Sequence, residues 1–224
     1  MKFAGKQRDE EVFDPDFVFS TVGEKWNVKA RENHWYSAST EFSVSRLGQG
    51  RGRSCLVVGS PFFEIAALTA IGWDVSYLDI RTPKQKTKFI RSDAMDMNVL
   101  DKSFDALSSA CVLTHVGTGR YGDTINPHGD EIMLSEVWRV LKDGAYASLT
   151  FGACADIPKM IRYPAHRIYS VGECKRMLAE TGFSVCEMKI WSNLSKDWLP
   201  DGSPPTKDTR KPDYISFLVQ KCGS

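Results

Sequence analysis

The stretch from Cys55 to Asp79 constrains the fold of this chain more than any other. It opens with a short apolar run that ends at Gly59, as a buried parallel strand ends at a turn. The pattern then predicts a helix over Glu64–Ile71 and a second strand that ends on an acid, Asp79. Gly59 and Asp79 lie roughly 20 residues apart, as in nucleotide-binding units built from a strand, a helix and a strand. We therefore expect the Asp79 carboxylate to accept both hydroxyls of an adenosine ribose.

The composition narrows the class of protein. A chain of 224 residues with 42% hydrophobic content can bury one substantial core. Its net charge of +1 gives no electrostatic reason to expect nucleic acid or a membrane surface as a partner. No window approaches the roughly 18 consecutive apolar residues of a spanning helix, and the N-terminal residues lack the apolar core of a secretion signal. The six cysteines are scattered, with no spacing suited to zinc. We expect a cytoplasmic α/β protein without a metal.

Strands and helices are expected to alternate along the rest of the chain. The predicted strands lie at 89–94, 103–113, 146–151, 183–191 and 214–219, and the predicted helices at 130–141 and 171–181. The last strand is expected to be antiparallel. Residues 1–50 form an N-terminal arm that either covers one edge of the domain or helps to close a substrate pocket. Residues 51–224 are predicted to form a three-layer, Rossmann-like sandwich around a mostly parallel seven-strand sheet, with a long loop over 192–212.

Several motifs in this order resemble class I S-adenosylmethionine-dependent methyltransferases. They are the glycine turn, the acid after the second strand, Asp93-Ala94 after the third, Phe104-Asp105 into the fourth, and Arg139-Val140-Leu141-Lys142 with Gly144 before the fifth. The resemblance runs from about Ser54 to Val219. Two blocks, HVGTGRYGD at 115–123 and AHRIYS at 165–170, more narrowly resemble a little-characterised, methyltransferase-like family of unknown function.

The resemblance implies S-adenosylmethionine as the cofactor. The residues that would bind it are Gly59, Ser60, Asp79, Asp93, Ala94, Ser109 and Ala110. Backbone N–H groups of the glycine turn would approach the methionine end of the cofactor. Asp79 would hold the ribose, and Asp93 would accept from the adenine amino group. Pro61 and Phe63 stand where the common pattern has further glycines, so a fold that no longer admits the cofactor stays open. The narrower family also lacks these glycines.

The substrate is expected at the carboxyl edge of the sheet, where open α/β sheets bind ligands. The expected substrate contacts are Arg120, Tyr121, Asp123 and Arg167. His166 is the expected general base, because an imidazole with a pKa near neutrality can take the proton of a hydroxyl. His115 is a second catalytic candidate. For each of these residues the alternative is a structural role: an Arg–Asp pair that stiffens a loop, or a histidine with its hydrogen bonds satisfied.

The sequence thus predicts transfer of a methyl group from S-adenosylmethionine to a small-molecule or sugar-like acceptor, at oxygen in preference to carbon. The alternative is a non-catalytic module that keeps the fold and uses its glycine-rich loop for a partner. A nicotinamide-dependent oxidoreductase is a third hypothesis, which the missing G-x-G-x-x-G pattern and the Asp93-Ala94 pair disfavour. The sequence predicts nothing about the oligomeric state.

Overall fold

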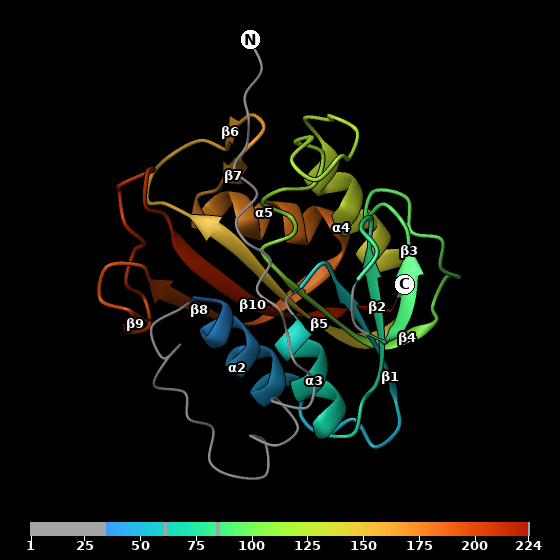
Figure 1. The fold of residues 1–224 in the computed structure, drawn as a ribbon. Helices are drawn as coiled ribbons and strands as arrows, with labels where there is room; N and C mark the ends of the chain where they lie inside the picture. The colour runs from blue at the N-terminus through green and yellow to red at the C-terminus, as the bar shows by residue number, and fades with distance from the viewer. Residues whose placement is uncertain (1–34, 61, 84–85, 224) are drawn as a thin grey trace.

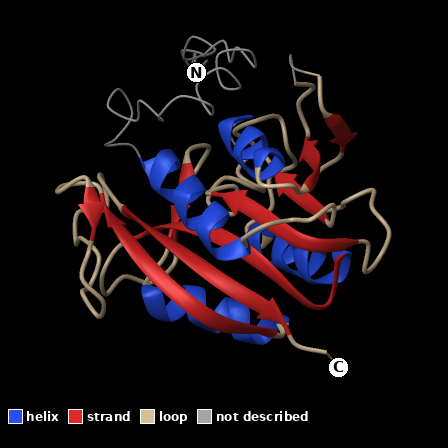
Figure 2. Ribbon diagram, turned by 90° about the horizontal axis from the view of Figure 1, so that it is seen from below, coloured by secondary structure: helices blue, strands red, loops and turns tan. Residues whose placement is uncertain are grey.

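The computed structural model describes residues 35–60, 62–83 and 86–223. In this part of the chain an eight-stranded sheet lies between two layers of helices (Figure 1, Figure 2). The strand order is β3-β2-β1-β4-β5-β10-β8-β9. The strands of this sheet are β1 (Ser54–Val58), β2 (Asp74–Asp79), β3 (Lys88–Arg91), β4 (Phe104–Ala110), β5 (Leu141–Ala153), β8 (Phe183–Ser192), β9 (Asp197–Trp198) and β10 (Asp213–Lys221).

The sheet is mostly parallel, as the sequence predicts. Strands β1 to β5 pair in parallel, whereas β10 is antiparallel to both of its neighbours, β5 and β8. The seven longer strands are those expected. The two-residue strand β9 adds an eighth within the segment that was predicted to be a loop. A second, two-stranded sheet pairs β6 (Met160–Arg162) with β7 (His166–Ile168).

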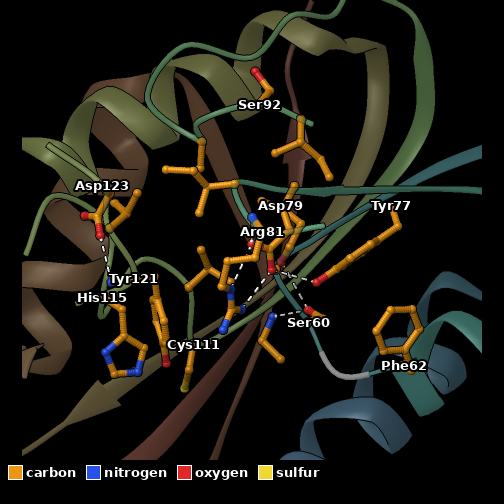
Figure 3. A pocket seen from close by; sticks show the side chains of 18 of the residues that line it. Ser60, Phe62, Tyr77, Asp79, Arg81, Ser92, Cys111, His115, Tyr121 and Asp123 are labelled. Atoms are coloured by element: carbon orange, nitrogen blue, oxygen red, sulfur yellow. Dashed lines mark hydrogen bonds and ion pairs between the residues drawn. The ribbon is translucent and has the colours of Figure 1, made fainter. Parts of the chain in front are cut away.

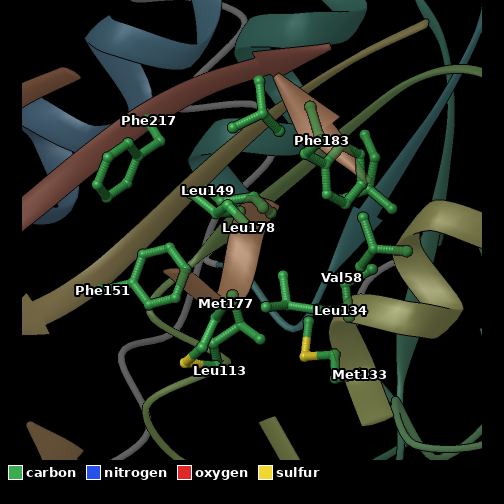
Figure 4. Packing of buried hydrophobic residues seen from close by; sticks show 14 of the residues in the cluster. Val58, Leu113, Met133, Leu134, Leu149, Phe151, Met177, Leu178, Phe183 and Phe217 are labelled. Carbon is green, nitrogen blue, oxygen red and sulfur yellow. The ribbon is translucent and has the colours of Figure 1, made fainter. Parts of the chain in front are cut away.

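One helix pair covers each face of the large sheet. Helices α2 (Trp35–Leu47) and α3 (Phe62–Ala70) lie on one face, and α4 (Gly129–Val140) and α5 (Val171–Thr181) lie on the other (Figure 1). The side chains of β1 alternate between them, with Leu56 and Val58 in the core below α4 and α5, and Val57 in the core below α2 and α3. Figure 4 shows the larger of these cores. Because the interior strands are buried on both faces, they appear in the sequence as continuous apolar runs.

Local capping explains which helix bounds were predictable. Helix α5 has the predicted bounds, since the Ser170 hydroxyl accepts from the Glu173 N–H at its start and Gly182 adopts φ = 97° at its end. Helix α4 instead ends at Val140, and β5 begins at the next residue, Leu141. Strand β5 is therefore longer than the predicted strand at 146–151. The buried Lys221 ammonium donates to the carbonyls of Trp138 and Leu141 at this junction.

The predicted N-terminal arm is described only from residue 35 onward, because residues 1–34 lie outside the described part. Helix α2 lies against the central strands β4, β5 and β10. Two buried serine hydroxyls on α2 attach it to β5: Ser39 bonds Thr150 at 2.8 Å and Ser43 bonds Ser148 at 2.8 Å. The helix therefore covers a face of the sheet. None of the described helices is long and apolar enough to cross a bilayer.

Candidate functional site

A cavity of about 670 Å³ lies at the carboxyl ends of β1, β2 and β4 (Figure 3). We call one wall the strand-end half: Gly59, Ser60, Asp79, Arg81, Asp93, Ala94 and Ala110. We call the other wall the loop half: Tyr36, Ser37, Phe63, Cys111, His115, Tyr121 and Asp123. The strand-end half follows from the register of neighbouring parallel strands, whereas the loop half is assembled from α2, α3 and the segment after β4.

The turn after β1 requires a glycine. Gly59 adopts φ = 58°, and a Cβ there would lie 2.7 Å from Cγ2 of Val112. Its N–H donates to the Leu78 carbonyl at the end of β2 at 2.8 Å. The buried Ser60 hydroxyl accepts from the Ala110 N–H at 2.8 Å. These bonds join the ends of three neighbouring strands into one wall.

Asp79 lies at the end of β2 with its carboxylate almost fully buried. One oxygen accepts from the Arg81 N–H at 2.8 Å and Nε at 3.1 Å. The other accepts from the Tyr77 hydroxyl at 2.7 Å and from Arg81 Nη2 at 2.9 Å. The Arg81 side chain is 54% exposed, against 6% for Asp79. The Asp79 carboxylate, which was predicted to bind the ribose, thus already accepts four hydrogen bonds. Three of them come from Arg81, whose side chain is partly exposed to solvent.

Arg81 also connects the two halves of the cavity. Its guanidinium carbon lies 4.3 Å from the centre of the Tyr121 ring, which is close enough for a cation–π contact. The sequence pattern did not mark Arg81 as a lining residue of the cavity. Its position two residues after the acid is the only local signal for this role.

The remaining predicted cofactor residues separate into those that line the cavity and one that does not. Asp93 and Ala94 line it after β3, and one Asp93 oxygen accepts from the Met95 N–H at 2.9 Å. Ala110 lines it at the end of β4. Its neighbour Ser109 is buried but does not line the cavity, because successive side chains of a strand point to opposite faces.

Sequence reasoning also missed two lining residues of the loop half. Tyr36 comes from α2, and its pKa is raised by burial and by the nearby Cys111 and Tyr121 groups. Cys111 follows β4 with φ = 60°, and burial raises the pKa of its thiol. Both groups therefore stay protonated at neutral pH. Strained backbone of this kind in a non-glycine residue gathers at functional sites.

His115 lines the cavity as a neutral imidazole. Its Nδ1 lies 2.8 Å from the Ala165 carbonyl, which can only accept, so Nδ1 carries the proton and Nε2 the lone pair. The pKa of His115 is lowered to about 4, mainly by burial; the bond to Ala165 acts in the opposite direction, and the positive charge of Arg120 acts in the same direction as burial. The ring meets Tyr121 edge-on, with ring centres 5.7 Å apart.

The glycine-rich loop brings two of its three predicted residues to the cavity. Tyr121 and Asp123 line it, and the Asp123 carboxylate accepts from the N–H groups of Gly119 at 3.2 Å and Tyr121 at 3.1 Å. Arg120 is exposed and does not line the cavity. Its guanidinium donates to the Ala165 carbonyl at 3.0 Å.

His166 and Arg167 lie on β7, outside the cavity lining. Arg167 is fully buried and donates to the carbonyls of Val116 and, at 2.7 Å, Asn126. Buried His166 Nε2 has no hydrogen-bond partner among the described residues. Burial, then the charges of Arg162 and Arg120, lower the pKa of His166. The small second sheet directs Arg167 toward the base of the glycine-rich loop, which the sequence pattern did not reveal.

Comparisons with known proteins give a family and a fold. A family model described as "Caenorhabditis protein of unknown function, DUF268" matches residues 52–195. No curated protein matches the sequence significantly.

Within the described residues, no three His, Cys, Asp or Glu side chains are grouped so as to hold a metal ion.

Solved structures of methyltransferases share the fold. The 1,6-didemethyltoxoflavin-N1-methyltransferase of Burkholderia thailandensis, solved with 1,6-didemethyltoxoflavin and S-adenosylhomocysteine, has a TM-score of 0.63 at 14% identity, covering 99% of each chain. An S-adenosylmethionine-dependent methyltransferase of Methanosarcina mazei has a TM-score of 0.54 at 19% identity, covering 78% of this chain and 94% of that chain.

A [4+2]-cyclase, SpnF, has the same fold. Its TM-score is 0.59 at 15% identity, covering 86% of this chain and 81% of that chain. At these identities the likeness shows the fold alone. The predicted resemblance to the class I methyltransferase fold is confirmed, and the cyclase shows that this fold also supports other reactions.

Proposed function

We propose that this chain, which belongs to the family described as "Caenorhabditis protein of unknown function, DUF268", is an S-adenosylmethionine-dependent methyltransferase that acts on a small-molecule acceptor. One observation carries the proposal. The strand-end half of the cavity combines a glycine turn, a buried acid and the Asp93-Ala94 turn at the carboxyl ends of adjacent parallel strands. Ligands bind at this edge in open α/β sheets.

The residues present fit the cofactor. A cavity of about 670 Å³ falls within the roughly 300–1,000 Å³ of cofactor and small-molecule sites. Phe63, which raised the question of crowding, forms part of the wall and leaves this volume open. Pro61 lies outside the described residues. The Asp79 carboxylate is engaged by Arg81, but a half-exposed arginine can turn toward solvent and leave the acid to ribose hydroxyls.

Each cofactor-binding residue has a distinct role in this proposal. Asp79 accepts hydrogen bonds from the ribose, Asp93 accepts from the adenine amino group, and Gly59 allows the backbone to approach the methionine end. When bound, the cofactor supplies an electrophilic methyl group on its sulfonium sulfur.

We place the general base at His115 and not at His166, because only His115 lines the cavity. The bond from Nδ1 to Ala165 fixes the ring and leaves the Nε2 lone pair to accept a proton. Because its pKa is lowered to about 4, His115 is uncharged at neutral pH but is a weak base. It would accept the proton only as the bond between the acceptor oxygen and the methyl carbon forms and makes that proton acidic.

The acceptor is proposed to be small and to react at oxygen. It must share one cavity with the cofactor, and the aromatic side chains of Tyr36, Phe63 and Tyr121 give that cavity an apolar lining suited to a planar or sugar-like molecule. We place the enzyme in the cytoplasm, and its net charge of +1 gives no electrostatic reason to expect nucleic acid as a partner, which favours a small-molecule substrate.

The proposal is tested with S-adenosylmethionine that carries a labelled methyl group, incubated with fractions of a small-molecule extract. The wild type is expected to transfer label to at least one fraction. The His115→Gln variant should transfer it about a hundredfold more slowly and still bind S-adenosylhomocysteine, because it loses a base and no cofactor contact. A His115→Gln enzyme with full activity would end the role of this residue.

The occupied state of Asp79 favours one competing function, a non-catalytic module with the methyltransferase fold. In such a module Arg81 would stay bonded to the Asp79 carboxylate, which could then accept no hydrogen bond from a ribose. S-Adenosylhomocysteine would then leave the melting temperature unchanged, whereas binding to the native state raises it. Binding without label transfer to any fraction would indicate a cofactor-binding module.

A further inference from the structure

The glycine-rich loop over residues 117–126, which we call the cavity loop, has a closed neck. The Asn126 N–H donates to the Gly117 carbonyl at 2.8 Å, so the two ends of the loop meet. Gly117 adopts φ = 70°, and a Cβ there would lie 2.5 Å from the Asn126 carbonyl oxygen. It would also lie 3.2 Å from Arg167 Nη2, so a residue other than glycine would open the neck.

The Arg167 guanidinium forms hydrogen bonds with both ends of the cavity loop. Its Nη1 donates to the carbonyl of Val116, just before the loop, and its Nη2 donates to the carbonyl of Asn126, its last residue. The side chain is fully buried. A planar guanidinium can bridge two carbonyls in this way, whereas a single ammonium cannot reproduce its fixed geometry.

Asp130 compensates the charge of the buried arginine. Its Oδ1 lies 3.6 Å from Arg167 Nε, and its side chain is equally buried. The Tyr169 hydroxyl donates to Asp130 Oδ2 at 2.8 Å, and the Lys159 ammonium lies 2.9 Å from the same oxygen. Because an unpaired charge is costly in the interior, the Asp130 carboxylate offsets the buried charge of Arg167, and the contacts with Tyr169 and Lys159 hold that carboxylate in place.

We infer that Arg167 and Asp130 are positioning residues, which hold the cavity loop in the conformation that places Tyr121 and Asp123 on the cavity wall. The consequence for the acceptor rests on the proposed function: the acceptor wall is formed before any ligand binds. Arg167 acts through backbone carbonyls and makes no contact with substrate. This reverses the role that the sequence predicted for it.

Hydrogen exchange of the wild type, followed by mass spectrometry, tests the inference without any substitution. The neck amide of Asn126 should exchange as slowly as amides of the large sheet. The exposed turn at 201–203 provides a reference for an unsupported loop. Exchange of the cavity loop as fast as in that turn would overturn the inference.

The Arg167→Lys variant tests the cause. It keeps a positive charge beside Asp130 but loses the planar guanidinium that donates to both carbonyls. Hydrogen exchange in the cavity loop should therefore rise about tenfold, whereas β1 and β4 should exchange as in the wild type. Lys221→Met is the matched control, because Lys221 is also a buried cation that donates to two carbonyls, at the junction of α4 and β5. It should lower global stability and so speed exchange in the cavity loop and in the large sheet by the same factor, with no selective effect on the loop.

Two results would contradict the inference: a folded Arg167→Lys variant with unchanged exchange in the cavity loop, or a Lys221→Met variant in which exchange of the loop rises relative to the sheet as much as in Arg167→Lys. If Arg167→Lys does not fold, the wild-type measurement still decides. Titration with S-adenosylhomocysteine separates this inference from the proposed function. Cofactor affinity should change less than about threefold in Arg167→Lys, since Arg167 touches no strand-end residue. A wild type that binds no cofactor would refute the function and leave the loop result standing.

Discussion

The two halves of the cavity are built by different means. The strand-end half consists of residues at the ends of four adjacent parallel strands, so strand register alone brings Gly59, Asp79, Asp93 and Ala110 together. The loop half depends on α2, on the start of α3 and on a loop with a buried support beneath it. The first arrangement follows from the fold shared with many methyltransferases. The second depends on side chains outside the sheet, and we expect it to determine the acceptor.

Removal of the acid should have the largest effect and tests the strand-end half. Asp79→Asn should weaken binding of S-adenosylhomocysteine about a hundredfold in calorimetric titration, because it removes a buried charged acceptor from the ribose. Asp74→Asn is the control, since this acid lies at the exposed opposite end of β2. Equal affinities for Asp79→Asn and the wild type would show that the two halves do not divide cofactor from acceptor as described.

A substitution of His115 tests whether water is excluded from the loop half, as the lowered pKa of this residue indicates. The folded-state pKa of about 4 lies below the ordinary value of 6.5, so the unfolded chain binds more protons between these values. The stabilising contribution is complete above pH 6.5 and is lost as the pH falls toward 4. His115→Gln should reduce the loss of unfolding free energy between pH 7 and 4.5 by about 2 kcal/mol in urea titrations.

The control for this measurement is His128→Gln, which changes an imidazole that is 70% exposed. It should change the pH dependence of the unfolding free energy by less than about 0.5 kcal/mol, because an exposed ion pair such as that with Glu131 contributes little. Loss of stability toward low pH that is the same in His115→Gln and in the wild type would mean that the imidazole is solvated, and the loop half open to water.

The hydroxyl contacts beneath α2 give a smaller effect on stability. Ser43→Ala should lower the unfolding free energy by about 1.5 kcal/mol, because the buried Ser148 hydroxyl loses its partner and the Ser108 hydroxyl keeps only its bond to Glu64. Ser45→Ala provides the control on the same helix, since Ser45 is exposed and bonds only its own helix and its neighbour Arg46. Similar stabilities for the two variants would argue that α2 is held by apolar packing alone.

The smallest expected effect is a gain in affinity at the boundary between the halves. Arg81→Gln should bind S-adenosylhomocysteine about fivefold more tightly, because the cofactor no longer competes with a partly exposed ion pair for Asp79. Arg91→Gln, an exposed arginine at the end of β3, is the control and should not change the affinity. Weaker binding in Arg81→Gln would show that the arginine contacts the cofactor instead of competing with it.

The sequence predicted the sheet and most of the strand-end half for a physical reason. Buried parallel strands appear as apolar runs, and an acid or glycine at the end of such a run must lie at the carboxyl edge of the sheet. The cap residues Ser170 and Gly182 similarly set the bounds of α5. These features depend on residues that are close together in the sequence, so the sequence pattern shows them directly.

The loop half could not be predicted in this way. Helix α2 buries serine hydroxyls in place of an apolar stripe, so its pattern gave no sign that Tyr36 would reach the cavity. His166 and Arg167 stood in a motif that matched a substrate role. Their orientation is set by the pairing of β7 with β6 and by a carboxylate at Asp130, on another element. Contacts of this range leave no periodic signal.

Calorimetric titration of the wild-type chain with S-adenosylhomocysteine, and in parallel with NAD, tests the central claim most directly. The account predicts saturable binding of the first compound at one site per chain, displaced by S-adenosylmethionine, and no heat of binding from NAD. A wild-type chain that binds neither sulfur compound, or that binds NAD instead, would contradict it.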